Sequence, residues 1–99
     1  MLSQAWELRN ASTHIGTLTL IEINQPWFRC AFTPGDGWAE VETLFAVQAE
    51  AFDGGEEPVM REAVRAVKDL HLQLHPQEGG EAITPVMMHI RGSEANFRY

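Results

Sequence analysis

The segment 86–99 at the end of the chain constrains the fold more than any other part of the sequence. Gly92-Ser93 is typical of a two-residue hairpin turn, because glycine readily takes the positive φ that such a turn requires. Pairing about this turn gives one apolar face: Val86, Met88, Ile90, Ala95, Phe97 and Tyr99. The opposite face carries Met87, His89, Arg91, Glu94, Asn96 and Arg98. The segment therefore predicts two antiparallel strands with one dry face and one wet face.

Three further strands are expected at the start of the chain, because apolar and β-branched residues alternate there with polar ones. We place them at 6–9, 14–23 and 27–32. Asn24-Gln25 is interpreted as the turn between the second and third strands, and Pro26 then begins the third strand.

The apolar period then changes to that of a helix. A stripe over 38–52 consists of Val41, Leu44, Phe45, Gln48 and Phe52. We expect Asp36 to cap the first helix and Asp53-Gly54-Gly55 to end it. A second helix opens at Glu56-Glu57-Pro58, with a stripe of Val59, Met60, Ala63, Val64 and Val67.

Residues 70–75 fit two patterns. Leu70, Leu72 and Leu74 alternate with polar residues as in a strand, although Leu70 and Leu74 could also extend the preceding helical stripe. We favour the strand, because the alternation holds up to Pro76. The expected order is βββ-αα-βββ in one domain, residues 1–99: an α+β fold with a mostly antiparallel sheet and two helices packed on one face.

Charge and composition narrow the classes of function. The net charge is −7, and residues 36–62 alone hold eight acids and one base. Such an acidic surface repels phosphate backbones, which argues against nucleic-acid binding, and it could attract a basic protein partner to the acidic helices.

The single cysteine excludes an internal disulfide. No run is long and apolar enough for a membrane span or a signal peptide, so we expect a cytoplasmic protein.

Motifs for catalysis, a cofactor or a metal are not found in the sequence. His71 and His75 would share a face on a helix, but on a strand they lie about 13 Å apart, too far to bind one zinc ion. Cys30 lies between Phe28 and Phe32 on one side of a strand and is interpreted as a buried, inert thiol. We therefore expect no cofactor and no metal site, and we favour a non-catalytic protein while enzymatic activity stays open.

The wet face of the last hairpin is one candidate site. His89, Arg91, Asn96 and Arg98 lie together on it, and two guanidinium groups beside an imidazole could bind a carboxylate or a phosphate. The competing interpretation is that Arg91 pairs with Glu94 while the other side chains face solvent.

An apolar sheet face is the second candidate. Pairing about Asn24-Gln25 places Thr19, Ile21, Ile23, Phe28, Cys30 and Phe32 on one face of the second and third strands. The opposite face then carries Leu18, Leu20, Trp27 and Ala31. If the first face meets the helices, the second is exposed and could form a dimer interface. Strand curvature or the Trp6 segment could instead cover it.

Several segments, placed in this order, also resemble a known group. They are Trp6-Glu7-Leu8-Arg9, Gly16-Thr17-Leu18-Thr19-Leu20, Pro26-Trp27-Phe28 and the ending His89 to Arg98. Together they resemble a group of small single-domain bacterial proteins, seen especially in actinobacteria, for which no activity is established. The resemblance implies a stand-alone bacterial cytoplasmic domain and carries over no site residue.

Two hypotheses of function follow from the sequence. The first is a non-catalytic interaction or accessory protein that forms a homodimer through the sheet face of Leu18, Leu20, Trp27 and Ala31. The second is a small-ligand or anion-binding protein that uses His89, Arg91, Asn96 and Arg98, with hydrolysis of the ligand as an open alternative.

Overall fold

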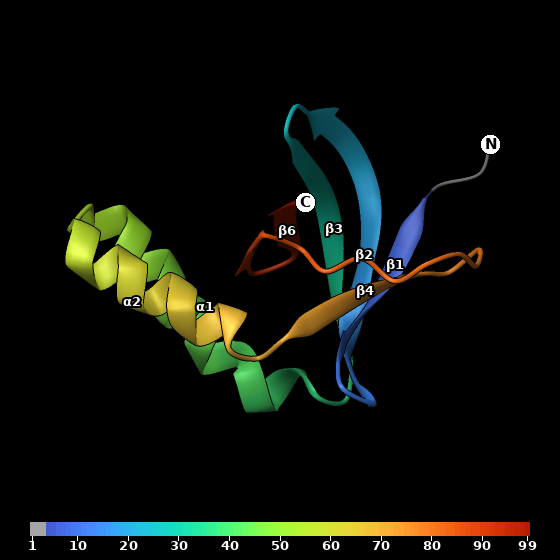
Figure 1. Cartoon of the computed structure of the whole chain (residues 1–99), viewed down its shortest axis with the longest axis horizontal. Helices are drawn as coiled ribbons and strands as arrows, with labels where there is room; N and C mark the ends of the chain where they lie inside the picture. The colour runs from blue at the N-terminus through green and yellow to red at the C-terminus, as the bar shows by residue number, and fades with distance from the viewer. Residues whose placement is uncertain (1–3) are drawn as a thin grey trace.

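The computed structural model describes residues 4–99, which form a βββ-αα-βββ arrangement (Figure 1). The strands are β1 (Ala5–Asn10), β2 (Thr13–Asn24), β3 (Trp27–Pro34), β4 (Leu72–Pro76), β5 (Met87–Arg91) and β6 (Glu94–Arg98). The helices are α1 (Trp38–Gly54) and α2 (Glu57–Lys68), between β3 and β4. The predicted α+β class and element order are confirmed, and residues 72–76 form a strand.

The six strands form one antiparallel sheet in the order β4-β1-β2-β3-β6-β5. The predicted closing hairpin is confirmed in its register, since Ile90 pairs with Ala95 and Met88 with Phe97. These four side chains are all buried, so the dry face of the hairpin lies in the core as expected.

The sheet is strongly curled. The ring centroids of Trp6 on β1 and Phe97 on β6 lie 5.1 Å apart, although β2 and β3 separate their strands. In a flat sheet three strand spacings would hold them about 14 Å apart. The curl encloses a core of aromatic and aliphatic side chains, and the loop after β4 runs across the sheet toward β5 (Figure 1). Ile83 in this loop exchanges two backbone hydrogen bonds of 2.8 Å with Leu74.

The pairing of β2 with β3 contains a β-bulge, which corrects the expected face of β2, whereas Phe28, Cys30 and Phe32 of β3 face the core as expected. The turn lies at Gln25-Pro26, and Ile21 is an extra residue between the Glu22–Arg29 and Leu20–Cys30 pairs. An extra residue reverses the side to which every earlier side chain in the strand points. Leu18 is therefore fully buried and Ile21 is 52% exposed, the reverse of the prediction.

The helices begin and end where local backbone geometry dictates. Gly37, not the expected Asp36, precedes α1, and no side chain of the described residues caps the helix. The Gly37 amide donates instead to the His14 carbonyl oxygen at 2.9 Å, which ties the turn to β2. At the other end Gly55 has φ +72°, and its amide donates to Ala51 O, as the predicted glycine stop requires. Pro58 lies in the first turn of α2, as expected.

Both helices pack beside the sheet. α1 contacts β5 and β2, and α2 packs on α1 and contacts β5. The buried side chains of α1 are Val41, Phe45, Gln48 and Ala51, and those of α2 are Ala63 and Val67. Among residues 4–99, neither helix has the length and apolar character needed to cross a membrane.

Candidate functional site

The predicted polar face forms a shallow hollow. His89, Arg91 and Asn96 line a space of about 340 Å³ together with Trp27, Phe52 and Glu94. Phe52 comes from α1, and its ring stands edge-on to the His89 imidazole with centroids 4.7 Å apart. Arg98 lies on β6 but does not line this hollow. The structure thus brings together three of the four predicted ligand-binding residues.

The guanidinium groups around this hollow are already paired. Arg91 donates to both carboxylate oxygens of Asp53, at 2.8 and 3.2 Å, and to the Ala49 carbonyl oxygen at 3.1 Å. Asp53 and Ala49 belong to α1, so this contact ties the helix to β5. The predicted Arg91–Glu94 ion pair is therefore replaced by one across elements, because α1 lies beside β5.

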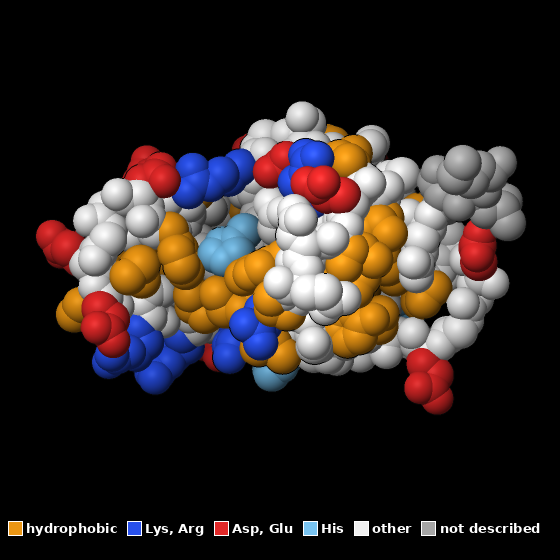
Figure 2. Space-filling model, turned by 90° about the horizontal axis from the view of Figure 1, so that it is seen from above, with side chains coloured by type: hydrophobic (Ala, Val, Ile, Leu, Met, Phe, Trp, Pro, Cys, Tyr) orange, Lys and Arg blue, Asp and Glu red, His pale blue; other side chains and the backbone are white. Residues whose placement is uncertain are grey.

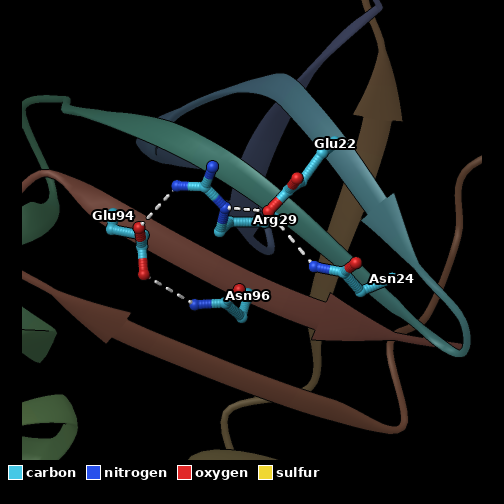
Figure 3. A network of polar contacts seen from close by, with 5 residues as sticks. All are labelled: Glu22, Asn24, Arg29, Glu94 and Asn96. Atoms are coloured by element: carbon cyan, nitrogen blue, oxygen red, sulfur yellow. Dashed lines mark hydrogen bonds and ion pairs between the residues drawn. The ribbon is translucent and has the colours of Figure 1, made fainter.

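Glu94 pairs instead with Arg29, within a network drawn in Figure 3. Arg29 donates to Glu22 at 2.7 Å and to Glu94 at 3.0 Å, and Asn96 donates to Glu94 at 3.3 Å. These contacts, with Arg29 the largest cause, lower the pKa values of Glu22 and Glu94. The carboxylate at the edge of the hollow is thus held in its charged form.

His89 is held in its neutral form. Burial lowers the pKa of the imidazole, and the nearby charge of Arg91 lowers it further. A neutral imidazole, a paired guanidinium and a carboxylate offer a negatively charged ligand little attraction. The geometry of the hollow therefore does not favour the predicted anion site.

Other chemically capable side chains lack the geometry that catalysis requires. Glu7 and Thr17 both approach the same nitrogen of His14, Nε2, at 3.9 and 3.5 Å. A proton relay needs one partner on each ring nitrogen, so this cluster is not a catalytic triad.

Burial raises the pKa of the Cys30 thiol to about 12, which leaves it unreactive at neutral pH. Within residues 4–99, no three His, Cys, Asp or Glu side chains converge as metal ligands.

A second cavity resembles a small-molecule binding site more closely than the hollow around His89 does. It has a volume of about 320 Å³ and lies among the two helices, the start of β4 and the segment that enters β5. We call it the Gln48 cavity; its lining consists of Gln48, Val64, Val67, Lys68, His71, Leu72, Thr84, Pro85, Val86, Met87 and Met88. Most of these side chains are apolar, as in many small-molecule sites.

Gln48 is the one buried polar side chain in this part of the core. It is 1% exposed, and its Oε1 atom has no hydrogen-bond partner among the described residues. It lies on the buried face of α1 because it is one turn from Phe45 and Ala51. Buried polar atoms are almost always paired, so an unpaired oxygen on a side chain that lines a cavity makes Gln48 the candidate polar contact for a ligand there.

The outer end of the Gln48 cavity carries exposed polar side chains. Lys68 ends α2, His71 lies between α2 and β4, and Thr84 lies in the loop before β5. His71 has φ +52°, an uncommon left-handed conformation for a residue other than glycine. This conformation lets the chain turn sharply from α2 into β4 and sets the rim of the cavity.

The sequence contained only part of this site. The helical stripe predicts that Gln48 is buried, but an amide in such a stripe does not by itself predict a cavity beside it. The sequence assigns no role to Lys68, and it indicates only that His71 is a strand histidine that cannot share a zinc ion with His75. The cavity forms where α2, β4 and the 84–88 segment meet, and no local pattern predicts that meeting.

The predicted interface residues do not form one exposed surface. Leu18 is fully buried and Leu20 packs against the core. Trp27 packs on His89, with ring centroids 5.5 Å apart, and Ala31 lies half-buried opposite Thr19. Figure 2 shows hydrophobic side chains scattered over the face drawn there. The large exposed apolar side chains lie on β2, on both helices and in segments next to β5 and β6: Ile21, Ile23, Val47, Phe52, Val59, Val86 and Tyr99.

Comparisons of the chain with protein-family models, with curated proteins and with solved structures found no match.

Proposed function

We propose that this protein is a non-catalytic binding protein for a small, largely apolar molecule, which it holds in the Gln48 cavity. The observation that carries the proposal is the unpaired Oε1 atom of Gln48, buried beside an apolar cavity of about 320 Å³. This volume lies near the lower end of the range of small-molecule sites.

The energetics of the amide support binding. A buried acceptor without a donor destabilises a fold by about 1–3 kcal/mol, and a ligand that supplies the donor removes this penalty. The apolar walls contribute further, at about 25 cal/mol for each Å² of apolar ligand surface removed from water. An amide does not titrate, so Gln48 can hold and orient a ligand but cannot serve as a general acid or base.

A titration with heptan-1-ol tests the proposal, because this probe combines an apolar chain with one hydroxyl donor. We expect saturable binding, seen as a rise in melting temperature and as chemical-shift changes at Gln48 and the methyl groups of Val67 and Met88. Shifts that grow linearly without saturation, or that lie outside the lining residues, would overturn the proposal.

Two matched variants locate the binding. Thr84→Trp places a large ring at the opening of the Gln48 cavity, where Thr84 is exposed, so we expect it to abolish the saturable shifts. Val47→Trp adds the same ring on α1, at a position that is 48% exposed and outside the lining, and should leave binding unchanged. Equal binding by both variants would contradict the proposed location.

A further inference from the structure

The Gln48 cavity has two chemically different ends. At the inner end lies the buried amide of Gln48, and at the outer end lies Lys68, an exposed residue. Between them the walls are apolar and include Val64, Val67 and Leu72. A ligand that matches this lining must itself have a polar group at each end of an apolar body.

The inner end selects a hydroxyl group. Gln48 Oε1 has no hydrogen-bond donor and exposes less than 1 Å², so a hydroxyl supplies the donor once the amide turns toward the cavity. A hydroxyl also accepts a hydrogen bond, so it remains complementary if the amide turns its nitrogen toward the ligand. A charged group would be unsuitable here, since burial of an ion beside a neutral amide is far more costly than burial of a hydroxyl.

The outer end selects a single negative charge. Among residues 4–99, Lys68 is the only lysine or arginine in the lining, and no aspartate or glutamate of this range lines the cavity. This contrasts with a net charge of −7 and eight acids between residues 36 and 62. Lys68 also makes no ion pair with the other described residues, so its ammonium group is free to meet a carboxylate.

From this arrangement we infer that the ligand is a short ω-hydroxycarboxylic acid, with the hydroxyl on Gln48, the hydrocarbon between the apolar walls and the carboxylate at Lys68. The inference rests on the proposed function, because it names the class of molecule that the same cavity holds. The methionines Met87 and Met88 suit a flexible chain, since unbranched thioethers adapt to irregular shapes.

Three probes of equal chain length test the two ends separately: 8-hydroxyoctanoate, octanoate and octan-1-ol, each titrated below its aggregation limit and followed by NMR. Octanoate lacks the inner hydroxyl and octan-1-ol lacks the outer carboxylate. We expect 8-hydroxyoctanoate to bind at least about five-fold more tightly than either, the effect of one hydrogen bond or one ion pair.

Three variants assign each preference to a residue. Gln48→Met, which keeps the side-chain length, should remove the advantage of 8-hydroxyoctanoate over octanoate and keep its advantage over octan-1-ol. Lys68→Met should do the opposite. Arg65→Met is the matched control, because it removes an equal charge from the same helix at a position outside the lining, and it should change neither preference.

The outcomes separate this inference from the proposed function. If the three probes bind the cavity with equal affinity, the cavity binds apolar molecules in general, and the inference that the ligand is a hydroxycarboxylic acid is wrong. If Arg65→Met weakens carboxylate binding as much as Lys68→Met, the carboxylate is attracted by the overall positive charge of the helix. The assignment of the carboxylate to Lys68 is then wrong. If no probe binds saturably, octan-1-ol included, the proposed function itself fails.

Discussion

At the scale of single residues, Gln48 occupies a buried position where an apolar side chain would give a more stable fold than an unpaired amide. Its neighbours on the buried face of α1 are Phe45 and Ala51, and its oxygen lacks a partner. Proteins keep such groups where binding requires them, at the expense of stability. The free energy of unfolding should therefore reveal what the amide does.

Replacement of this amide should make the ligand-free protein more stable. We expect Gln48→Met to raise the free energy of unfolding by about 1–3 kcal/mol, since it removes an unpaired buried acceptor and keeps the side-chain volume. Urea denaturation measures the change. Gln73→Met on β4, where Gln73 is exposed, is the control and should stay within about 0.5 kcal/mol. A loss of stability in Gln48→Met would mean that the amide has a structural partner.

The thiol of Cys30 should be inert in the folded protein. Cys30 is fully buried, and burial raises its pKa to about 12, so almost no thiolate exists at pH 8. We expect an aromatic disulfide reagent to modify it only at the rate of unfolding, and at once in 6 M guanidinium chloride, a concentration of the order that unfolds even hyperstable domains. Rapid reaction of the native protein would contradict this burial.

Gly16 is required by close packing. A Cβ atom added there would lie 2.4 Å from Cε1 of Phe32 and 2.7 Å from the Thr33 carbonyl oxygen. The second contact is with backbone, which cannot move as a side chain does. Gly16→Ala should destabilise the protein by about 1–3 kcal/mol. Gly54→Ala at the end of α1 is the matched control, because nothing lies within 4 Å of its Cβ position, and it should be neutral or stabilising by up to about 1 kcal/mol. Calorimetry of both variants compares them directly.

At the scale of elements, the bulge at Ile21 determines which side chains of β2 enter the core. Because of this extra residue, Leu18 and Leu20 point inward, where a regular ladder would point them outward. The inversion matters for function, since it removes the apolar outer face that predicted a dimer interface.

A pair of truncations tests the inverted strand. Leu18→Ala should cost about 2–5 kcal/mol, because Leu18 is fully buried. Ile21→Ala should stay within about 0.5–1 kcal/mol, because Ile21 is 52% exposed. Chemical denaturation of both variants distinguishes the two registers, since a regular ladder predicts the opposite order.

The elements that sequence alone could predict are those defined by local rules. The Gly92-Ser93 turn, the glycine stop of α1 and the alternation over Leu72 to Leu74 depend on neighbouring residues, and each was predicted in place. The bulge and the Gln48 cavity were not, because each depends on how distant segments meet. The unpaired residue Ile21 alone reversed the expected face of β2, because the displacement of the turn by one residue leaves the same side chains of the two strands on a common face.

At the scale of the whole molecule, the curl of the sheet and the position of α1 bring ionisable groups together from distant parts of the chain. Asp53 on α1 meets Arg91 on β5, and the ion pair lowers the pKa of Asp53. Arg29 likewise lowers the pKa values of Glu22 and Glu94. A carboxyl group whose pKa is lower in the folded state contributes stability above its unfolded pKa and loses it as the pH falls through the folded value.

As the pH falls, His89 should cause a first loss of stability, at a higher pH than the loss caused by the carboxylates. Burial, then Arg91, lowers its pKa from 6.5, so the unfolded state binds the proton more readily and stability falls below about pH 6.5. The three carboxylates follow at lower pH, below their ordinary values of 4.5 and 3.8. Urea midpoints measured from pH 8 to pH 3 should therefore fall in two phases, and His89→Gln should remove the upper one.

The two causes of the His89 shift can be separated by NMR titration of its imidazole. Arg91→Met removes the smaller cause, so the pKa of His89 should rise but stay below 6.5, because burial remains. Arg98→Met removes an equal charge from the neighbouring strand β6, which is not a cause of the shift, and should leave that pKa in place. An imidazole that titrates above 6.5 in the wild-type protein would mean that the ring is solvated. In that case the packing of α1 against β5 would differ from the structure described above.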